Sequence, residues 1–262
     1  MPRLAVNNVG MHYVESGQGS ALLLLHGVGG SHEMWLPIVP ELAKSRRVIT
    51  ADHRGHGASD KPRGSYTISL FCQDWLALRD ARKVGRAHLV GLSMGGAIAM
   101  RLALEHPQRV RSQVLVDTWA CPHPAFLALL RKRLERLASG DLAAYADEAI
   151  PQVYSPAFIA ANPQAMADYR ARVATLNPDS IRAAVDACIT HDMRGRQAEI
   201  KVPTLVVVGS EDRLTPPYHS EYLARTIPNA QLVVIRGSGH IPHLEKPWEF
   251  LKVMADFTAS SS

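Results

Sequence analysis

A serine stands between glycines in the stretch Gly91-Leu92-Ser93-Met94-Gly95. An apolar run over residues 87–90 precedes this stretch, and a helix-like run over residues 96–103 follows it. In the context of a strand, a sharp turn and a helix, G-x-S-x-G holds a serine hydroxyl exposed at the positive end of a helix dipole. A serine becomes a nucleophile only when a base removes its proton and a third group orients that base. Without such partners, the same five residues would form an ordinary strand–helix turn.

The partners of Ser93 are predicted from two later loops, because Asp212 and His240 each come shortly after a separate apolar run. In open α/β sheets the reactive groups gather at the carboxyl ends of the strands. The chain order serine, aspartate, histidine is one of the three known orders of a catalytic triad. We therefore predict Ser93 as the nucleophile, His240 as the base and Asp212 as the acid that orients the base. Asp117, which ends another apolar run, is the alternative acid.

A glycine-rich segment, His26-Gly27-Val28-Gly29-Gly30, follows the apolar run over residues 21–25. Acyl transfer needs donors for a developing oxyanion, and glycines let backbone N–H groups face the site. We predict the N–H groups of Val28 and Met94 as this pair of donors, with His26 fixing the loop by a hydrogen bond. A phosphate-binding loop is the weaker alternative, because the sequence contains neither G-x-G-x-x-G nor G-K-[ST].

Residues 52–60 bring aspartates, histidines, an arginine and glycines together. We expect a structural role for this segment, in which Arg54 pairs with Asp52 or Asp60 and the glycines permit a tight reversal of the chain. A metal site here is the weaker alternative. We predict no metal and no cofactor.

The elements that must position these residues alternate along the chain. A hairpin is predicted from loose alternation of apolar and polar residues over residues 4–16. Further strands are predicted from apolar runs at residues 21–25, 47–51, 87–90, 113–116, 204–208 and 231–235. Helices are predicted at residues 34–43, 67–83, 218–226 and 247–257, and after Ser93 as far as Pro107. Strands that alternate with helices form a mostly parallel sheet covered on both faces.

This alternation stops over residues 120–195, where the clearest patterns are helices at 127–137, 163–176 and 180–189. We expect residues 1–119 and 196–262 to form an α/β core. Residues 120–195 would form a helical lid, inserted after the sixth strand. The lid would set the choice of substrate, because it covers the chemistry.

Apolar and basic side chains in and near the expected lid are candidates for the substrate pocket. The predicted pocket residues are Trp119, Phe126, Leu130, Tyr154 and Ile241. Burial in the lid's own core is the alternative for the apolar residues. Arg131, Arg133 and Arg172 are candidates for binding a substrate carboxylate, with positions on the surface as the competing interpretation.

The 262 residues carry a formal net charge of +5, are 47% hydrophobic and are 20% charged, so the chain can bury a substantial core. The basic residues are spread along the sequence. The one cluster, residues 131–136, is interrupted by a leucine and a glutamate and is typical of a solvated helix face. We therefore expect no nucleic-acid partner.

Three cysteines, Cys72, Cys121 and Cys188, are widely spaced among apolar residues. An odd number with no metal-ligand spacing is typical of free thiols in a reducing compartment. No signal segment and no apolar run near the roughly 20 residues that span a bilayer is present. These features predict a cytoplasmic protein with no membrane partner.

Together these motifs resemble those of the α/β-hydrolase superfamily. The resemblance rests on residues 26–29, 52–59, 91–96, 203–212 and 239–240. It implies the α/β-hydrolase fold, with a mostly parallel eight-stranded sheet flanked by helices and a lid after strand six. Residues 91–96 and Asp117-Thr118 are most similar to the branch of 3-oxoadipate enol-lactonases and small carboxylesterases.

The expected function is that of a serine hydrolase that cleaves carboxylic esters or lactones through an acyl-enzyme. Its partner would be a small-molecule ester or lactone, and a homodimer stays open. Two alternatives use the same residues: a hydrolase of carbon–carbon bonds in ring-fission products, and a ligand receptor with vestigial hydrolysis. Related dehalogenases and epoxide hydrolases are disfavoured, because they carry aspartate where this chain has Ser93.

Overall fold

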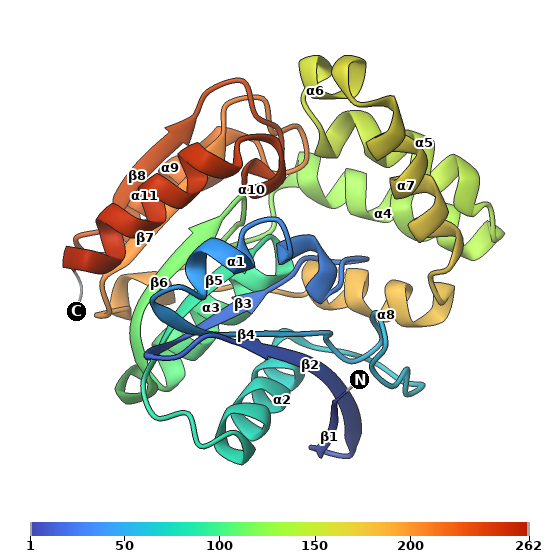
Figure 1. The fold of residues 1–262 in the computed structure, drawn as a ribbon. Helices are drawn as coiled ribbons and strands as arrows, with labels where there is room; N and C mark the ends of the chain where they lie inside the picture. Colours follow the sequence, from blue (N-terminus) through green and yellow to red (C-terminus); the bar gives the residue numbers. More distant parts are fainter. Residues whose placement is uncertain (1, 261–262) are drawn as a thin grey trace.

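The computed structural model describes residues 2–260, without the side chains of residues 259 and 260. One sheet of eight strands runs through the molecule in the order β1-β2-β4-β3-β5-β6-β7-β8 (Figure 1). The strands are β1 (Arg3–Val6), β2 (Val9–Ser16), β3 (Ser20–Leu25), β4 (Arg46–Ala51), β5 (Ala87–Leu92), β6 (Val110–Val116), β7 (Thr204–Gly209) and β8 (Gln231–Ile235). The pairs β1–β2 and β2–β4 are antiparallel, and all the other neighbours are parallel. This confirms the predicted α/β class and its mostly parallel sheet.

Alternate residues of the central strands face two separate hydrophobic cores, since successive side chains of a strand point to opposite faces. Helices α2 (Ile68–Ala81), α3 (Met94–Glu105) and α9 (Pro217–Thr226) pack on one face, against Leu23 and Leu89. Helices α1 (Val39–Leu42) and α11 (Pro247–Ser260) pack on the other face, against Leu24 and Val90. Burial on both faces explains why β3 and β5 are nearly continuous apolar runs.

The first predicted helix, over residues 34–43, is wrong in its extent. The structure has a 3-10 helix, η1 (His32–Trp35), followed by the single-turn α1. Pro37 and Pro40 lie in this segment, and a proline without an N–H cannot continue a helix from within. Pro40 is accommodated at the start of α1, where its missing donor does no harm.

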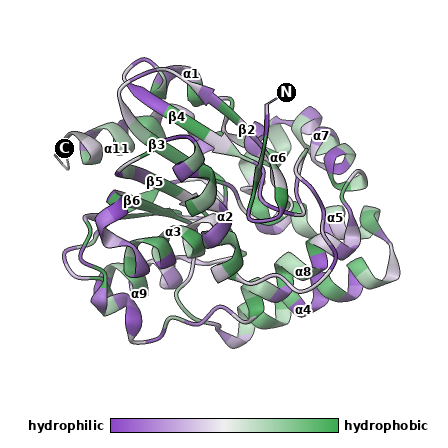
Figure 2. Ribbon diagram, turned by 90° about the horizontal axis from the view of Figure 1, so that it is seen from below, coloured by the Kyte–Doolittle hydropathy of each residue, from purple (hydrophilic) through white to green (hydrophobic). Residues whose placement is uncertain are grey.

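Five α-helices lie between β6 and β7: α4 (Pro124–Ser139), α5 (Leu142–Val153), α6 (Pro156–Ala161), α7 (Pro163–Ala174) and α8 (Pro178–Ile189). We call them the inserted helices. They gather on one side of the sheet in Figure 1, and α4 and α8 alternate hydrophobic and hydrophilic residues in Figure 2. The sequence predicted α4, α7 and α8 but not α5 and α6. Pro151 inside α5 and the six-residue length of α6 conceal their helical pattern.

The remaining elements are short: α10 (Pro242–Glu245) and the 3-10 helices η2 (Pro107–Arg109) and η3 (Arg196–Glu199). The three cysteines are free, as expected. Among the described helices, none is both long enough and apolar enough to cross a membrane.

Candidate active site

Ser93 occupies a sharp turn between the end of β5 and the start of α3. Its backbone has φ 55° and ψ −118°, a region that L-residues seldom adopt and that costs about 1–3 kcal/mol. Two hydrogen bonds hold it there: the Ser93 N–H donates to the carbonyl of Val116 (2.9 Å), and the hydroxyl of Thr118 donates to the Ser93 carbonyl (2.7 Å). Both partners come from the neighbouring strand β6 and its loop. The turn therefore keeps a strained serine in one fixed position.

Glycines make this turn sterically feasible. A Cβ on Gly95 would collide with the backbone of Leu25, and a Cβ on Gly91 would collide with the backbone of Gly95. The helix that follows Ser93 can therefore approach β3 and β5 closely only without side chains at these two positions.

Asp212 and His240 form a hydrogen-bonded pair in the loops that follow β7 and β8. The Nδ1 atom of His240 lies 2.8 Å from Oδ2 of Asp212. The other oxygen of Asp212 accepts the backbone N–H groups of Leu214 (2.8 Å) and Thr215 (3.0 Å), and the Thr215 hydroxyl donates to Oδ2 (2.7 Å). A carboxylate only accepts hydrogen bonds, so the His240 proton is on Nδ1 and its Nε2 is left to act as a base.

The electrostatics of Asp212 favour its ionised form. Burial acts to raise its pKa, but His240 and the Thr215 hydroxyl outweigh burial, and the net pKa lies below the ordinary value. Thr215 was not predicted from the sequence. Its position three residues after Asp212, which suits an Asx-type turn, is a signal that could have pointed to it.

Asp117, the alternative acid, has a different environment. Its Oδ1 accepts the N–H of Gly209 (2.9 Å), while its Oδ2 accepts no hydrogen bond from the described residues. Burial, and then the nearby Asp212 charge, raise the pKa of Asp117 well above the ordinary value. In the described part of the chain, the hydrogen bond of His240 goes to Asp212 and not to Asp117.

Ser93 and His240 line one cavity of about 740 Å³ between the sheet and the inserted helices. The segment from Gly27 to Ser31 lines it as well. A Cβ placed on Gly27 would lie 3.2 Å from the Cβ of Ser93, so this loop runs directly beside the serine. Val28 lines the cavity and Met94 begins α3, and neither N–H donates a hydrogen bond to another of the described residues.

Buried histidines fix the glycine-rich loop. His26 Nε2 accepts the N–H of His53 (3.0 Å), so its Nδ1 carries the proton and donates to the carbonyl of Gly27 (2.7 Å). His53 Nε2 donates to the His26 carbonyl (2.9 Å), and its Nδ1 accepts the indole N–H of Trp75 (3.0 Å). Burial holds the pKa values of His26 and His53 well below the ordinary value. These neutral rings act as structural supports, as expected for His26.

The charged segment over residues 52–60 is also structural, but its predicted ion pair is wrong. Arg54 pairs with Asp74 through two hydrogen bonds of 2.5 and 2.6 Å. Asp74 lies on α2, where nothing in the local sequence could indicate it as the partner. Asp60 pairs instead with Arg3.

Two groups of side chains are close enough to hold a metal ion: His12, His32 and Asp52, and Asp117, Asp212 and His240. In the first group, Asp52 accepts hydrogen bonds from Nδ1 of His12 (3.2 Å) and Nδ1 of His32 (2.9 Å). It also accepts hydrogen bonds from two backbone N–H groups. Its oxygens are therefore engaged in hydrogen bonds that join β2, the start of η1 and the segment over residues 52–60. The second group is the acid–base pair described above, and it fits proton transfer.

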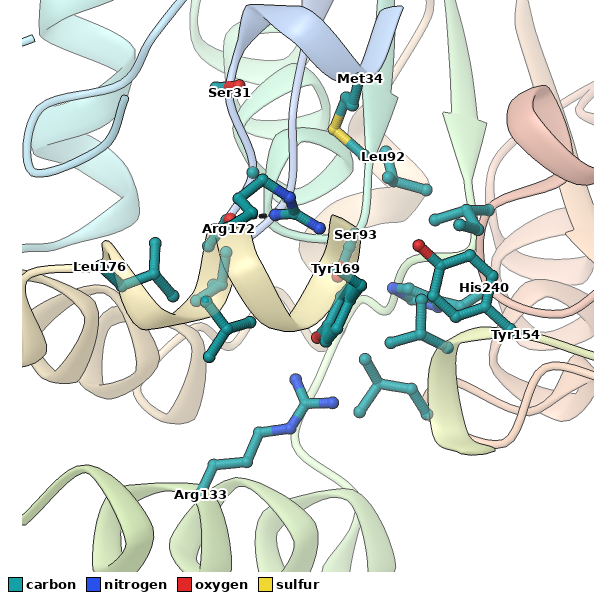
Figure 3. A pocket seen from close by; sticks show the side chains of 18 of the residues that line it. Ser31, Met34, Leu92, Ser93, Arg133, Tyr154, Tyr169, Arg172, Leu176 and His240 are labelled. Atoms are coloured by element: carbon teal, nitrogen blue, oxygen red, sulfur yellow. Dashed lines mark hydrogen bonds between the residues drawn. The ribbon is translucent and has the colours of Figure 1, made fainter. Parts of the chain in front are cut away.

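The cavity wall includes all the residues predicted for the substrate pocket: Trp119, Phe126, Leu130, Tyr154 and Ile241. Their contact with a substrate stays a prediction. Residues that were not predicted from the sequence also line the cavity, among them Met34, Tyr169, Leu176 and Leu244. Tyr169 and Leu176 belong to or follow α7, and only the packing of α7 over the sheet brings them to the site. Arg133 and Arg172 reach the cavity (Figure 3), whereas Arg131 is exposed.

The fold and this site define a class of protein. The sequence matches the alpha/beta hydrolase fold family over residues 20–247, and the chain belongs to that family. Among curated proteins it is similar to one from Pseudomonas savastanoi pv. phaseolicola, "Putative carbamate hydrolase RutD". The two are 30% identical over 94% of this chain and 96% of the relative.

Two solved structures are similar along nearly the whole chain. The enol-lactonase from Burkholderia xenovorans LB400 has a TM-score of 0.93 and 31% identity, covering 98% of this chain and 100% of the other. A thermophilic esterase from Thermogutta terrifontis, solved with malate bound, has a TM-score of 0.91 and 28% identity, covering 99% and 98% of the two chains. The predicted superfamily is confirmed, and similar proteins include enzymes named for lactones, esters and carbamates.

Proposed function

We propose that this protein is a serine hydrolase that cleaves carboxylic esters or lactones through an acyl-enzyme on Ser93. One observation carries the proposal: Ser93, in a strained strand–helix turn, lines the same cavity as His240, and Nδ1 of His240 is hydrogen-bonded to Asp212. Nucleophile, base and orienting acid come from the ends of three strands, which is the arrangement that activates a serine.

In the proposed mechanism, the Ser93 oxygen attacks the carbonyl carbon while His240 Nε2 takes the hydroxyl proton. Asp212 holds the imidazole in the required tautomer and stabilises its cationic form. The N–H groups of Val28 and Met94 bind the oxyanion of the tetrahedral intermediate. The intermediate collapses, the ester or lactone C–O bond breaks, and His240 gives its proton to the leaving alcohol oxygen. Water, deprotonated by His240, then releases the acid and restores Ser93.

The two proposed oxyanion donors are supported by their positions. Met94 is the first residue of α3, so its N–H is one of the helix-terminal donors that have no partner within the helix. Val28 lies in the loop that runs beside Ser93. Removing one such donor from an oxyanion site typically costs about 100- to 1000-fold in kcat.

The inserted helices are proposed to act as the lid of residues 120–195, with the core formed by residues 1–119 and 196–262. The support is that α4, α5, α7 and α8 all contribute side chains to the cavity that holds Ser93. Trp119, Phe126, Leu130, Tyr154 and Ile241 would contact the substrate.

Carbamates are the second candidate class of substrate. They are favoured by the similarity to relatives named carbamate hydrolase, at 30% to 33% identity over nearly the whole chain. A carbamate carbonyl would meet the same serine and oxyanion donors, so the proposed chemistry is unchanged.

A panel of substrates tests the proposal: p-nitrophenyl esters of increasing acyl length, lactones, phenyl carbamates and ring-fission acids. We expect multiple turnovers with esters or lactones, and a loss of about 10⁴- to 10⁶-fold in kcat for Ser93→Ala. Turnover of ring-fission acids alone would instead indicate carbon–carbon bond cleavage. At most one turnover with every compound would indicate a receptor. Ester hydrolysis that survives in Ser93→Ala would contradict the mechanism.

A further inference from the structure

Two arginines from the inserted helices reach the cavity that holds Ser93: Arg133 from α4 and Arg172 from α7 (Figure 3). On α4, the neighbouring Lys132 and Arg136 both pair with Glu148. Among the described residues, neither Arg133 nor Arg172 has a carboxylate within ion-pair distance. Cations inside a protein are normally paired, because an unpaired buried charge is costly.

The guanidinium of Arg172 is engaged in contacts within the protein. Its Nη1 donates to the carbonyl of Gly29 (2.5 Å), and its guanidinium lies 4.9 Å from the centre of the Tyr169 ring. These contacts tie α7 to the glycine-rich loop beside Ser93. Arg172 is thus a positioning residue for the loop of the oxyanion donors.

The guanidinium of Arg133 is held less fully by its neighbours. Its Nη2 donates to the neutral side chain of Gln152 (3.1 Å), and its guanidinium lies 6.0 Å from the centre of the Tyr145 ring. Its Nε is buried and has no hydrogen-bond partner among the described residues. The guanidinium points from α4 into the cavity (Figure 3). Arg133 therefore presents its terminal N–H groups to the substrate space, together with a charge that has no ion-pair partner among the described residues.

The two acidic residues of the cavity wall do not neutralise the positive charge of Arg133. Asp168 is exposed on α7 and accepts a hydrogen bond from Gln164 (2.9 Å). Glu33 is exposed on η1, where it lies 3.5 Å from the hydroxyl of Ser31. Neither forms an ion pair with Arg133.

We infer that Arg133 binds a carboxylate carried by the substrate, away from the bond that Ser93 attacks. The inference rests on the proposed function and narrows it to anionic esters or lactones. A guanidinium offers two parallel N–H donors in a plane, which matches the two oxygens of a carboxylate. Nη1 and one N–H of Nη2 can form that fork at the end of the guanidinium, while the other N–H of Nη2 keeps its bond to Gln152. A cavity of about 740 Å³ has room for such a substrate.

Matched pairs of substrates test the inference, each pair differing only in carboxylate against carboxamide. On the acyl side the pair is mono-p-nitrophenyl glutarate and its terminal amide. On the alcohol side the pair is 4-acetoxybenzoate and 4-acetoxybenzamide. We expect kcat/KM to favour the carboxylate by about 10- to 100-fold in at least one pair, the size of a hydrogen bond to a charged group. Equal rates within both pairs would overturn the inference.

Arg133→Gln should abolish that preference, and Arg133→Lys should restore part of it, because lysine keeps the charge but loses the planar fork. Arg131→Gln is the matched control, since Arg131 is exposed on the same helix and does not line the cavity. Arg131→Gln should retain the full ratio of kcat/KM for the carboxylate over the carboxamide substrate. If Arg133→Gln keeps the wild-type ratio and the wild-type melting temperature, Arg133 is not the carboxylate site.

Binding to Ser93→Ala separates this inference from the proposed function. Calorimetry with 4-acetoxybenzoate and 4-acetoxybenzamide requires no hydrolysis. Tighter binding of the carboxylate, lost when Arg133→Gln is added, supports the site even if no ester is turned over. Equal affinities for the two compounds in Ser93→Ala overturn the site even if esters are hydrolysed.

Discussion

Asp117 and Asp212 follow two adjacent strands, β6 and β7, and one carboxyl oxygen of each lies within 4.8 Å of the other. Two buried carboxyls this close do not both ionise readily, since each charge disfavours the other. Asp212 accepts four hydrogen bonds, one of them from His240, whereas Asp117 accepts one from Gly209. The negative charge therefore belongs on Asp212 and the proton on Asp117.

This division of charge predicts unequal effects for two asparagine variants. Asp212→Asn removes the charge that stabilises cationic His240 and should lower kcat by about 10⁴-fold. Asp117→Asn replaces a neutral acid with a neutral amide, whose oxygen can still accept the Gly209 N–H, and should change kcat less than about fivefold. Assays of both variants on one ester, with circular dichroism as the folding control, check this. A severe loss confined to Asp117→Asn would assign the acid to Asp117 instead.

The same asymmetry predicts a pH dependence of stability. In the unfolded chain Asp117 ionises at the ordinary pKa of about 3.9, whereas burial and Asp212 raise its pKa in the folded protein. The free energy of unfolding of the wild type therefore falls, relative to that of Asp117→Asn, as the pH rises from about 4 through the raised pKa. Each unit by which the pKa is raised adds about 1.4 kcal/mol to this difference.

Urea unfolding of the wild type and Asp117→Asn at a series of pH values measures that difference. Asp212, Glu245 and His240 face Asp117 in both proteins, so their own titration largely cancels in the comparison. A difference in unfolding free energy that stays constant from about pH 4 to 8 would show that Asp117 is ionised in the folded protein.

The close approach of α3 to β3 predicts a large effect at Gly95. In Gly95→Ala the new methyl group would meet the Leu25 backbone, which cannot move aside as a flexible side chain would. We expect a loss of about 2–4 kcal/mol in unfolding free energy, together with loss of activity. Gly85→Ala is the control: no atom lies within 4 Å of its added Cβ, and we expect no loss of stability. Equal effects of the two variants would refute the steric account.

The hydrogen bond between Arg172 and Gly29 predicts that α7 supports catalysis. Arg172→Met should lower kcat by about 10-fold for carboxylate and carboxamide substrates alike, because it loosens the loop that carries Val28. Arg170→Gln, on the same helix but exposed, serves as the control. Unchanged kcat in Arg172→Met would show that the loop does not depend on this bond.

The residues that meet in the cavity, Ser93 and His240, could be picked out from the sequence because their signals are local. Ser93 lies between two glycines directly after β5, and His240 follows a glycine in the loop after β8. The strand–turn–helix order then fixes where the serine must lie. Most strands were predictable too, because burial on both faces demands long apolar runs such as β3.

Contacts between distant segments could not be predicted in this way. The partner of Arg54 is Asp74, and the pairing depends on how α2 packs rather than on the spacing of the two residues. The protonation of Asp117 depends on the adjacency of β6 and β7, which is a property of the sheet order. Which arginine faces the cavity depends on the rotation of α4 about its axis: Arg131 and Arg133 differ by two residues, but only Arg133 lines the site.

The most direct test of the account is to trap the acyl-enzyme. The protein is mixed with p-nitrophenyl acetate, quenched in acid within the first turnovers and analysed by peptide mass spectrometry. We predict one acetyl group on the peptide that carries Ser93, slow loss of it in Asp212→Asn, and its absence in Ser93→Ala. An acetyl group on another residue during productive turnover, or rapid turnover by Ser93→Ala, would contradict nucleophilic catalysis by Ser93.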